Sequence, residues 1–197
     1  MNKRVLQGQE TKKRLIECAR RLFNERGYNN VTVDDIIRES GSSKGAFYTH
    51  FKTQELLLVD VFPFADDVYT DFINNVSLPE NTIDKIAFFS KYVLEFIENR
   101  AGLDFISVIY SAQIKDIEAD RIALDTMRKY YNILSTFLEE GKEKDEITSE
   151  MSTDEIKSMI TTILRGAIYD WCLYKGDFCL TDYGMKIINI YLDRIKK

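Results

Sequence analysis

The sequence predicts an all-α protein of about nine helices, and two observations carry this prediction. Proline occurs twice and glycine nine times in 197 residues, which is too few turn-forming residues for an architecture of strands and tight turns. Apolar residues instead recur three and four positions apart along most of the chain, which is the period of amphipathic helices. With 45% hydrophobic and 30% charged residues, the composition is that of a soluble globular protein.

The first helix is expected at about residues 11–26. Its apolar residues fall on one face at helical spacing, and Gly27 follows at the position where a left-handed residue is favoured. Tyr28 is expected to pack back onto the end of this helix. The residues of the apolar face are Leu15, Ile16, Ala19, Leu22 and Phe23.

Two short helices follow, joined by a tight turn. Thr32 is the N-cap expected for a helix over residues 33–40, and Gly41 ends that helix. Ser42 or Ser43 can cap the next helix. Two short helices around a glycine-containing turn are typical of a helix-turn-helix motif.

The second of these short helices has an apolar and a polar face. Phe47 and Phe51 lie four residues apart, so they share the face that is expected to point inward. The remaining positions then point outward, where a recognition helix contacts the major groove. These outward positions are Lys44, Gly45, Tyr48 and Thr49.

The rest of the chain predicts longer helices. We expect them at about 53–75, 82–99, 102–115, 119–144, 153–175 and 181–196. Pro63 falls inside the first of them and is expected to kink it.

Charge is distributed unevenly along the chain. Residues 1–58 hold eleven Lys and Arg against seven Asp and Glu, a net charge of about +4. Residues 59–197 hold 16 basic and 25 acidic residues, a net charge of about −9. The sequence therefore predicts a basic domain over 1–58 that binds a polyanion and a larger acidic domain over 59–197.

Several classes of protein are disfavoured. No apolar run approaches the ~18 residues of a membrane span, and the basic N-terminus lacks the apolar core of a secretory signal. Three scattered cysteines argue against a disulfide framework and favour a reducing cytoplasm. With one histidine and no nucleophile elbow, phosphate loop, Cys/His metal cluster or dinucleotide fingerprint, we expect no enzyme activity, no metal and no cofactor.

Residues 11–58 resemble the tetracycline-repressor (TetR) family of bacterial regulators. The resemblance rests on many positions at matching spacing. They are Ala19, Leu22-Phe23, Gly27-Tyr28, Thr32-Val33, Ile36, Gly41, Ser43-Lys44-Gly45, Phe47-Tyr48, His50-Phe51-Lys52 and Glu55-Leu56. The 139 residues from 59 to 197 resemble the family in length and helical character only. The resemblance implies an N-terminal three-helix DNA-binding domain and a C-terminal helical domain for ligand binding and dimerisation.

The expected DNA contacts follow from residue type and from this resemblance. Lys44 can donate to guanine, and Gly45 allows the backbone to approach the bases. The family implies phosphate contacts for Tyr48 and His50, and helix N-termini favour phosphate near Thr32. The full set is Thr32, Ser43, Lys44, Gly45, Tyr48, Thr49, His50 and Lys52. The alternatives are a cap without DNA contact for Thr32 and plain solvated side chains for Lys44 and His50.

One position departs from the family pattern. Relatives usually carry lysine where this chain has Gln54. We expect one phosphate contact to be lost there and DNA binding to depend more on Lys52.

The larger domain is rich in aromatic residues. Nineteen of the 24 aromatic residues lie in 59–197, and most are expected in the core. Together they can line an apolar cavity with a few polar groups, as a small-molecule site requires, and the family implies an effector there. The expected ligand-binding residues are Phe88, Phe89, Tyr92, Tyr110, Gln113, Tyr130, Arg165 and Tyr169.

Dimerisation is expected through helices 153–175 and 181–196. Gly166 and Ala167 permit close helix approach, and two helices from each subunit would form a four-helix interface. The alternative is that their apolar residues, such as Ile188 and Ile195, pack inside one subunit. A two-fold dimer is expected to bind a palindromic operator through its two recognition helices. An effector that favours one spacing of these two helices changes the affinity for DNA by linkage.

The expected function is thus a ligand-responsive regulator, acting as a repressor on double-stranded DNA and released by a small apolar or aromatic effector. One alternative is a DNA-binding protein with a structural or ligand-independent role. A second is a redox sensor that uses Cys172 and Cys179.

Overall fold

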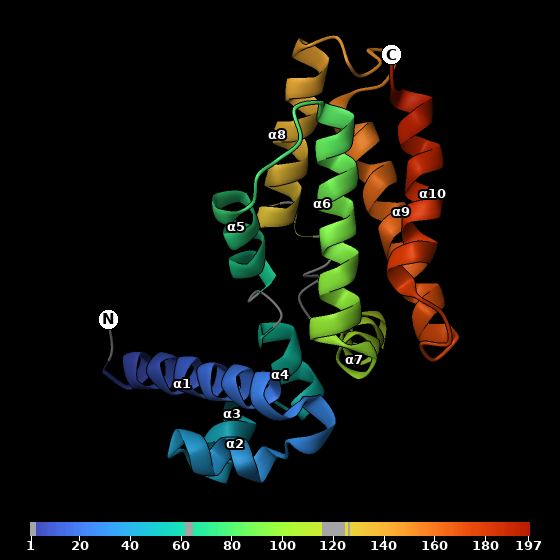
Figure 1. Cartoon of the computed structure of the whole chain (residues 1–197). Coiled ribbons are helices and arrows are strands. Elements are labelled where there is room, and N and C mark those ends of the chain that lie inside the picture. Colours follow the sequence, from blue (N-terminus) through green and yellow to red (C-terminus); the bar gives the residue numbers. More distant parts are fainter. Residues whose placement is uncertain (1–2, 62–64, 116–124, 126) are drawn as a thin grey trace. The chain divides into compact units, whose positions relative to one another are not determined.

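The computed structural model describes residues 3–61, 65–115, 125 and 127–197. All regular structure in these ranges is helical apart from one isolated bridge between Ile147 and Lys196, which confirms the predicted all-α class (Figure 1). The chain forms two compact units. The first comprises Met1–Ala65 with Ser107–Ala123, and the second comprises Asp66–Ile106 with Leu124–Lys197. The functional boundary at residue 58 stays a prediction.

The first unit is built on a long N-terminal helix. Helix α1 (Lys3–Arg26) contacts α2 (Val33–Ser40), α3 (Lys44–His50) and α4 (Gln54–Val61). α1 begins eight residues before the predicted start at residue 11. Its predicted apolar face is correct, and Tyr28 packs on Phe23 with 5.4 Å between ring centroids, also as predicted. The core of the unit contains Leu15, Ala19, Leu22, Ile36, Phe47, Phe51, Leu57 and Leu58.

The helix predicted over 53–75 is present as two helices. α4 ends at Val61, and α5 (Ala65–Asn75) begins after residues that the structure does not describe. Pro63 lies outside the described residues, so the predicted kink stays a prediction.

Four long helices dominate the second unit. They are α6 (Thr82–Phe96), α8 (Lys129–Glu143), α9 (Thr153–Leu173) and α10 (Leu180–Ile195). α6 contacts the other three, and Figure 1 shows them running side by side within this unit. α7 (Leu103–Lys115) starts in this unit, and its residues from Ser107 onward belong to the first unit.

Glycines allow close approach in this bundle. A Cβ atom on Gly184 of α10 would lie 2.6 Å from Leu94 Cδ1 on α6. A Cβ atom on Gly141 of α8 would lie 2.4 Å from Ile147 Cδ1 and 2.9 Å from Thr82 Cγ2. Real Cβ atoms do not tolerate such distances, so hydrogen at these two positions sets the spacing of the helices.

Two further predicted helices differ from the structure. The predicted residues 119–124 and 126 lie outside the described residues, and α8 begins at Lys129, where the Asp125 carboxylate accepts the N–H of Met127 and Arg128 is extended. The α-helix expected over 82–99 ends at Phe96 and continues as a π-helical turn over Ile97–Ala101, which closes at Gly102 with a positive φ of 81°.

Candidate nucleic-acid interface and ligand pocket

Helix α2 is fixed at both ends by its sequence. The Thr32 hydroxyl accepts the N–H of Asp35 at 3.1 Å, while the Asp35 carboxylate accepts both the hydroxyl and the N–H of Thr32. This confirms Thr32 as the N-cap and forms a complete capping box with Asp35. Gly41 ends the helix in the left-handed region with φ 61°, as expected. The turn that orients α3 is therefore specified locally.

The hydrogen bonds of this cap change the pKa of Asp35. The hydroxyl and the N–H of Thr32 both donate to its carboxylate and lower its pKa from 3.8 to about 2. Both donors of Thr32 are thereby occupied by Asp35, so the phosphate role of Thr32 competes with its role as a cap.

Helix α3 presents the surface that the sequence predicted. Ser43 caps it by accepting the N–H of Ala46 at 3.1 Å. Phe47 is fully buried and Phe51 is 2% exposed, with 5.6 Å between their ring centroids. The four residues expected to face outward, Lys44, Gly45, Tyr48 and Thr49, are all exposed.

The polar groups on this surface are only weakly engaged. Lys44 Nζ lies 3.4 Å from an oxygen of Asp34, and both side chains are more than half exposed. Ion pairs of this kind contribute little to stability, so Lys44 can exchange Asp34 for a DNA group at small cost. The Thr49 hydroxyl donates back to the carbonyl of Gly45 at 2.8 Å.

The three polar residues that follow α3 or end it differ in burial and in their contacts. His50 is half-buried and lies against α1, where a Cβ on Gly8 would be 3.8 Å from its ring. Lys52 is exposed. Gln54, at the position where relatives carry lysine, donates its amide to the carbonyl of Val31 at 2.9 Å. It thus ties the start of α4 to the loop before α2.

The second unit contains a continuous aromatic cluster. Phe89 stacks on Tyr130 with 5.7 Å between centroids, and Tyr69 contacts both of these rings. Phe72 lies 4.5 Å from Tyr92. Burial raises the pKa of Tyr69 and of Tyr130, so both phenols stay protonated.

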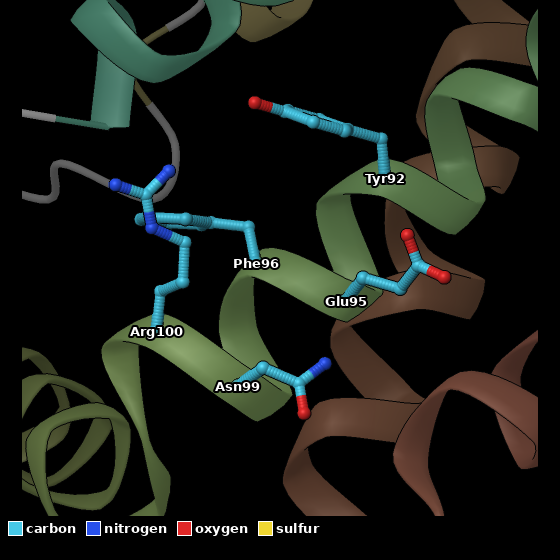
Figure 2. Close-up of a pocket in the computed structure, with 5 residues that line it drawn as sticks. All are labelled: Tyr92, Glu95, Phe96, Asn99 and Arg100. Carbon is cyan, nitrogen blue, oxygen red and sulfur yellow. The ribbon is translucent and has the colours of Figure 1, made fainter.

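A pocket of about 250 Å³ opens beside this cluster. Among the described residues, its lining comes from α6 and the π-helical turn: Tyr92, Glu95, Phe96, Asn99 and Arg100. In Figure 2 the side chains of Tyr92, Phe96 and Arg100, which are four residues apart, point to one side of the helix, and those of Glu95 and Asn99 point to the other. The cluster packs against the pocket, because the ring centroids of Phe96 and Tyr69 lie 6.1 Å apart.

The π-helical turn that carries two of the lining residues is held in place from α10. Glu98 accepts the hydroxyl of Thr181 at 2.6 Å and the backbone N–H groups of Leu180 and Thr181. Partial burial raises the pKa of Glu98, but these hydrogen bonds outweigh burial and the pKa lies below its ordinary value. Glu98 is therefore an ionised anchor, and it fixes Asn99 and Arg100 next to it.

The residues predicted to bind a ligand are distributed over several places. Tyr92 lines the pocket, while Phe89 and Tyr130 lie in the aromatic cluster behind it. Phe88 packs on Phe72 and is 37% exposed. Arg165 and Tyr169 lie on α9, and Tyr110 and Gln113 lie on the part of α7 that belongs to the first unit.

Sequence reasoning did not select Glu95, Phe96, Asn99 or Arg100. The available signal was their helical spacing from Tyr92. This spacing was not recognised as a site, because three of the four residues are polar and their pattern is that of a solvent-exposed helix face.

The described cysteines are free thiols, and two of them have raised pKa values. The N–H of Asp182 donates to the Cys179 sulfur and lowers its pKa, but burial and the Glu98 carboxylate raise it more, so the thiol lies above its ordinary pKa. Burial also raises the pKa of Cys18. A raised pKa disfavours the thiolate that a redox sensor needs.

The described residues contain no group of three or more His, Cys, Asp or Glu side chains placed to hold a metal ion. None of their helices is both long and apolar enough to cross a membrane.

Two family models match the chain. The model described as bacterial regulatory proteins, tetR family, matches residues 15–61, and the model described as YsiA-like protein, C-terminal region, matches residues 74–193. An HTH-type transcriptional regulator of Staphylococcus aureus (strain MRSA252) is 23% identical over 198 residues, covering 95% of this chain and 96% of the relative.

Solved structures share the fold. RolR in complex with resorcinol superposes with a TM-score of 0.69 at 21% identity, covering 96% of this chain and 89% of that one. FadR from Bacillus subtilis in complex with stearoyl-CoA gives a TM-score of 0.63 at 19% identity, covering 91% of this chain and 97% of that one.

Proposed function

We propose, from the premise that this chain belongs to the TetR family of bacterial transcriptional regulators, that it represses transcription by binding a palindromic operator as a homodimer. A small apolar or aromatic effector releases it from the DNA. The family consists of DNA-binding regulators and not of enzymes. The place of action follows from the DNA target and is the cytoplasm, at the nucleoid.

The observation that carries this proposal is the outer face of α3. Phe47 and Phe51 anchor the helix from within, and Lys44, Tyr48 and Thr49 are exposed side by side. A helix of this size fits the major groove, where lysine reads guanine and tyrosine or threonine contacts phosphate. The positive end of the α2 helix dipole favours phosphate as well.

Exposed apolar side chains support a homodimer through α9 and α10. Met159 and Tyr169 are each 46% exposed, Leu173 is 60% exposed, and together with Gly166 they share one face of α9. Ile190 of α10 is 73% exposed. Exposed apolar side chains gathered on one helix face are typical of a protein interface.

Other residues of these helices belong to the subunit itself. Ile188 and Ile195 of α10 are buried inside the second unit. The core alternative therefore holds for these two residues, and the proposed interface consists of the exposed set.

Effector response is supported by the pocket beside the aromatic cluster. Relatives of this fold have been solved with resorcinol and with stearoyl-CoA. An effector that binds more tightly to the dimer when its two recognition helices have the wrong spacing for the operator lowers the affinity for DNA. By linkage, the free energy lost in DNA binding equals the free energy lost in effector binding when DNA is bound.

Footprinting on the intergenic DNA upstream of the chain's own gene tests the proposal. We expect two protected half-sites whose centres lie about one helical turn, or a small multiple of it, apart, and weaker protection when a small-molecule cell extract is added. Tyr48→Ala should abolish protection. Tyr174→Ala, a matched change of an exposed tyrosine on the second unit, should not.

Two outcomes would contradict parts of the proposal. Protection that no extract weakens would favour the ligand-independent DNA-binding role. Protection of a single half-site would refute the homodimer.

A further inference from the structure

Two acidic residues lie in the first turn of helix α2, and they have different partners. Asp35 is engaged in the cap, where Thr32 and Arg38 both donate to its carboxylate. Asp34 instead contacts the neighbouring helix, because its Oδ1 atom lies 3.4 Å from Lys44 Nζ at the start of α3. The helix-turn-helix motif therefore places a carboxylate directly beside the lysine that we expect to contact guanine.

The backbone positions of Asp34 and Lys44 are fixed by the ends of their helices. The capping box sets the first turn of α2, the Gly41 turn orients α3, and the Ser43 hydroxyl accepts the N–H of Ala46 at 3.1 Å. The side chains of Asp34 and Lys44 are 74% and 66% exposed, and exposed ion pairs are weak. Both groups can therefore take DNA partners without rearrangement of the backbone.

A carboxylate on a DNA-binding surface is unfavourable unless the DNA offers it a donor. Close to phosphate it lowers the affinity by repulsion between like charges. In the major groove cytosine presents a donor, its N4 amino group, while guanine presents two acceptors, O6 and N7. Aspartate is therefore complementary to cytosine, and lysine is complementary to guanine.

The spacing of the two side chains matches the edge of one base pair. Guanine O6 and cytosine N4 share a Watson–Crick hydrogen bond, so they lie about 2.9 Å apart. Lys44 Nζ and Asp34 Oδ1 lie 3.4 Å apart and have the opposite polarity, so lysine can donate to O6 while the carboxylate accepts from N4. A T·A pair has the same order of acceptor and donor but lacks the second acceptor beside the lysine, and C·G and A·T pairs reverse the order. A G·C pair therefore fits best, and the reversed pairs fit worst.

We propose that Asp34 and Lys44 together read one G·C base pair in each half-site, with Lys44 donating to the guanine and Asp34 accepting from the cytosine N4 amino group. The proposal rests on the proposed function, since it names the base pair that this surface of the regulator selects. Asp34 also acts against a wrong pair, because in C·G its carboxylate meets the guanine acceptors. The acid thus increases specificity and lowers the affinity for random DNA.

Selection of binding sites from random DNA duplexes gives the operator, and a base analogue in that operator tests the contact. We expect a palindrome in which each half-site requires one G·C pair, and in which C·G or A·T at that position binds most weakly. N4-methylcytosine keeps its pairing with guanine but loses the hydrogen that it presents in the major groove. In one half-site it should weaken binding of the full-length protein roughly tenfold, as loss of a hydrogen bond to a charged group does.

Three variants assign this effect to Asp34. Asp34→Ala should bind the selected operator more weakly and random DNA more tightly, and it should bind cytosine and N4-methylcytosine operators equally within about twofold. Asp34→Asn keeps the size of the side chain and should narrow the difference between G·C and C·G, because an amide donates as well as accepts. Asp154→Ala is the matched control, since Asp154 lies at the same position in the first turn of α9 and pairs with Lys157 at 2.6 Å. This variant should retain the full effect of the methyl group.

An effect of N4-methylcytosine that survives Asp34→Ala would overturn the proposal. Tighter operator binding by Asp34→Ala would overturn it too, since the acid would then only repel DNA. A selected palindrome without a G·C requirement would refute the base pair and leave the proposed function standing. Selection that enriches no palindrome would refute the proposed function, and the proposal with it.

Discussion

Replacing Gly166 by alanine separates the stability of one subunit from the stability of the proposed dimer. Gly166 lies in the middle of α9, is exposed, and a Cβ added there meets nothing within 4 Å in its own subunit. Alanine is favoured over glycine by about 1 kcal/mol in a helix interior, so each subunit should gain about that much. For a domain of this size this raises Tm by roughly 2–4 °C.

The dimer should respond in the opposite direction. If the exposed face around Gly166 packs on its symmetry mate, two new methyl groups enter the interface of each dimer. Overpacking costs about 1–3 kcal/mol, and each 1.4 kcal/mol is tenfold in affinity. We expect the dimer dissociation constant to rise at least tenfold.

Sedimentation equilibrium gives the dissociation constant, and urea unfolding at protein concentrations below it gives subunit stability. Gly184→Ala is the matched control, since its Cβ would lie 2.6 Å from Leu94 Cδ1 inside the subunit. It should lower subunit stability. A Gly166→Ala protein with unchanged dimerisation would refute the assignment of this face to the interface.

Two further predictions concern the fold. Arg128 donates two hydrogen bonds to Asp66 at 3.1 and 3.2 Å, with side-chain exposures of 9% and 29%. Arg128→Gln should therefore cost about 1–3 kcal/mol in urea unfolding, between the values for surface and for buried pairs, whereas Arg194→Gln, which breaks an exposed pair, should cost less than about 0.5 kcal/mol. The folded-state pKa of Asp35 is about 2, below the 3.8 that is usual for an aspartate, so its contribution to stability is present above pH 4 and is lost as pH falls toward 2. Thr32→Val removes the largest cause of the shift, and a carbon-detected NMR titration should show the Asp35 pKa returning toward 3.8; a pKa that stays near 2 would refute the role of the Thr32 hydroxyl.

The elements that sequence alone predicted are those with strong local signals. The Thr32 cap, the Gly41 turn and the spacing of Phe47 and Phe51 specified α2 and α3, including the outward face. These signals work because each is satisfied within a few residues of the chain.

Other features depend on contacts that the pattern does not contain. The first turns of α1 have no apolar period around Gly8, yet the helix extends to Lys3. The pocket depends on the π-helical turn and on Glu98, which reaches α10 more than 80 residues away. The position of Asn99 and Arg100 beside the pocket therefore depends on a contact that the local sequence does not contain.

The salt dependence of binding to the upstream intergenic DNA tests the central claim, that the outer face of α3 reads DNA. We expect binding far tighter than to random DNA, and a slope of log K against log salt that falls in magnitude by about one in Lys44→Ala. Lys186→Ala, a matched loss of an exposed lysine on α10, should leave the slope unchanged. Binding no tighter than to random DNA, or a slope that responds equally to the two substitutions, would contradict the claim.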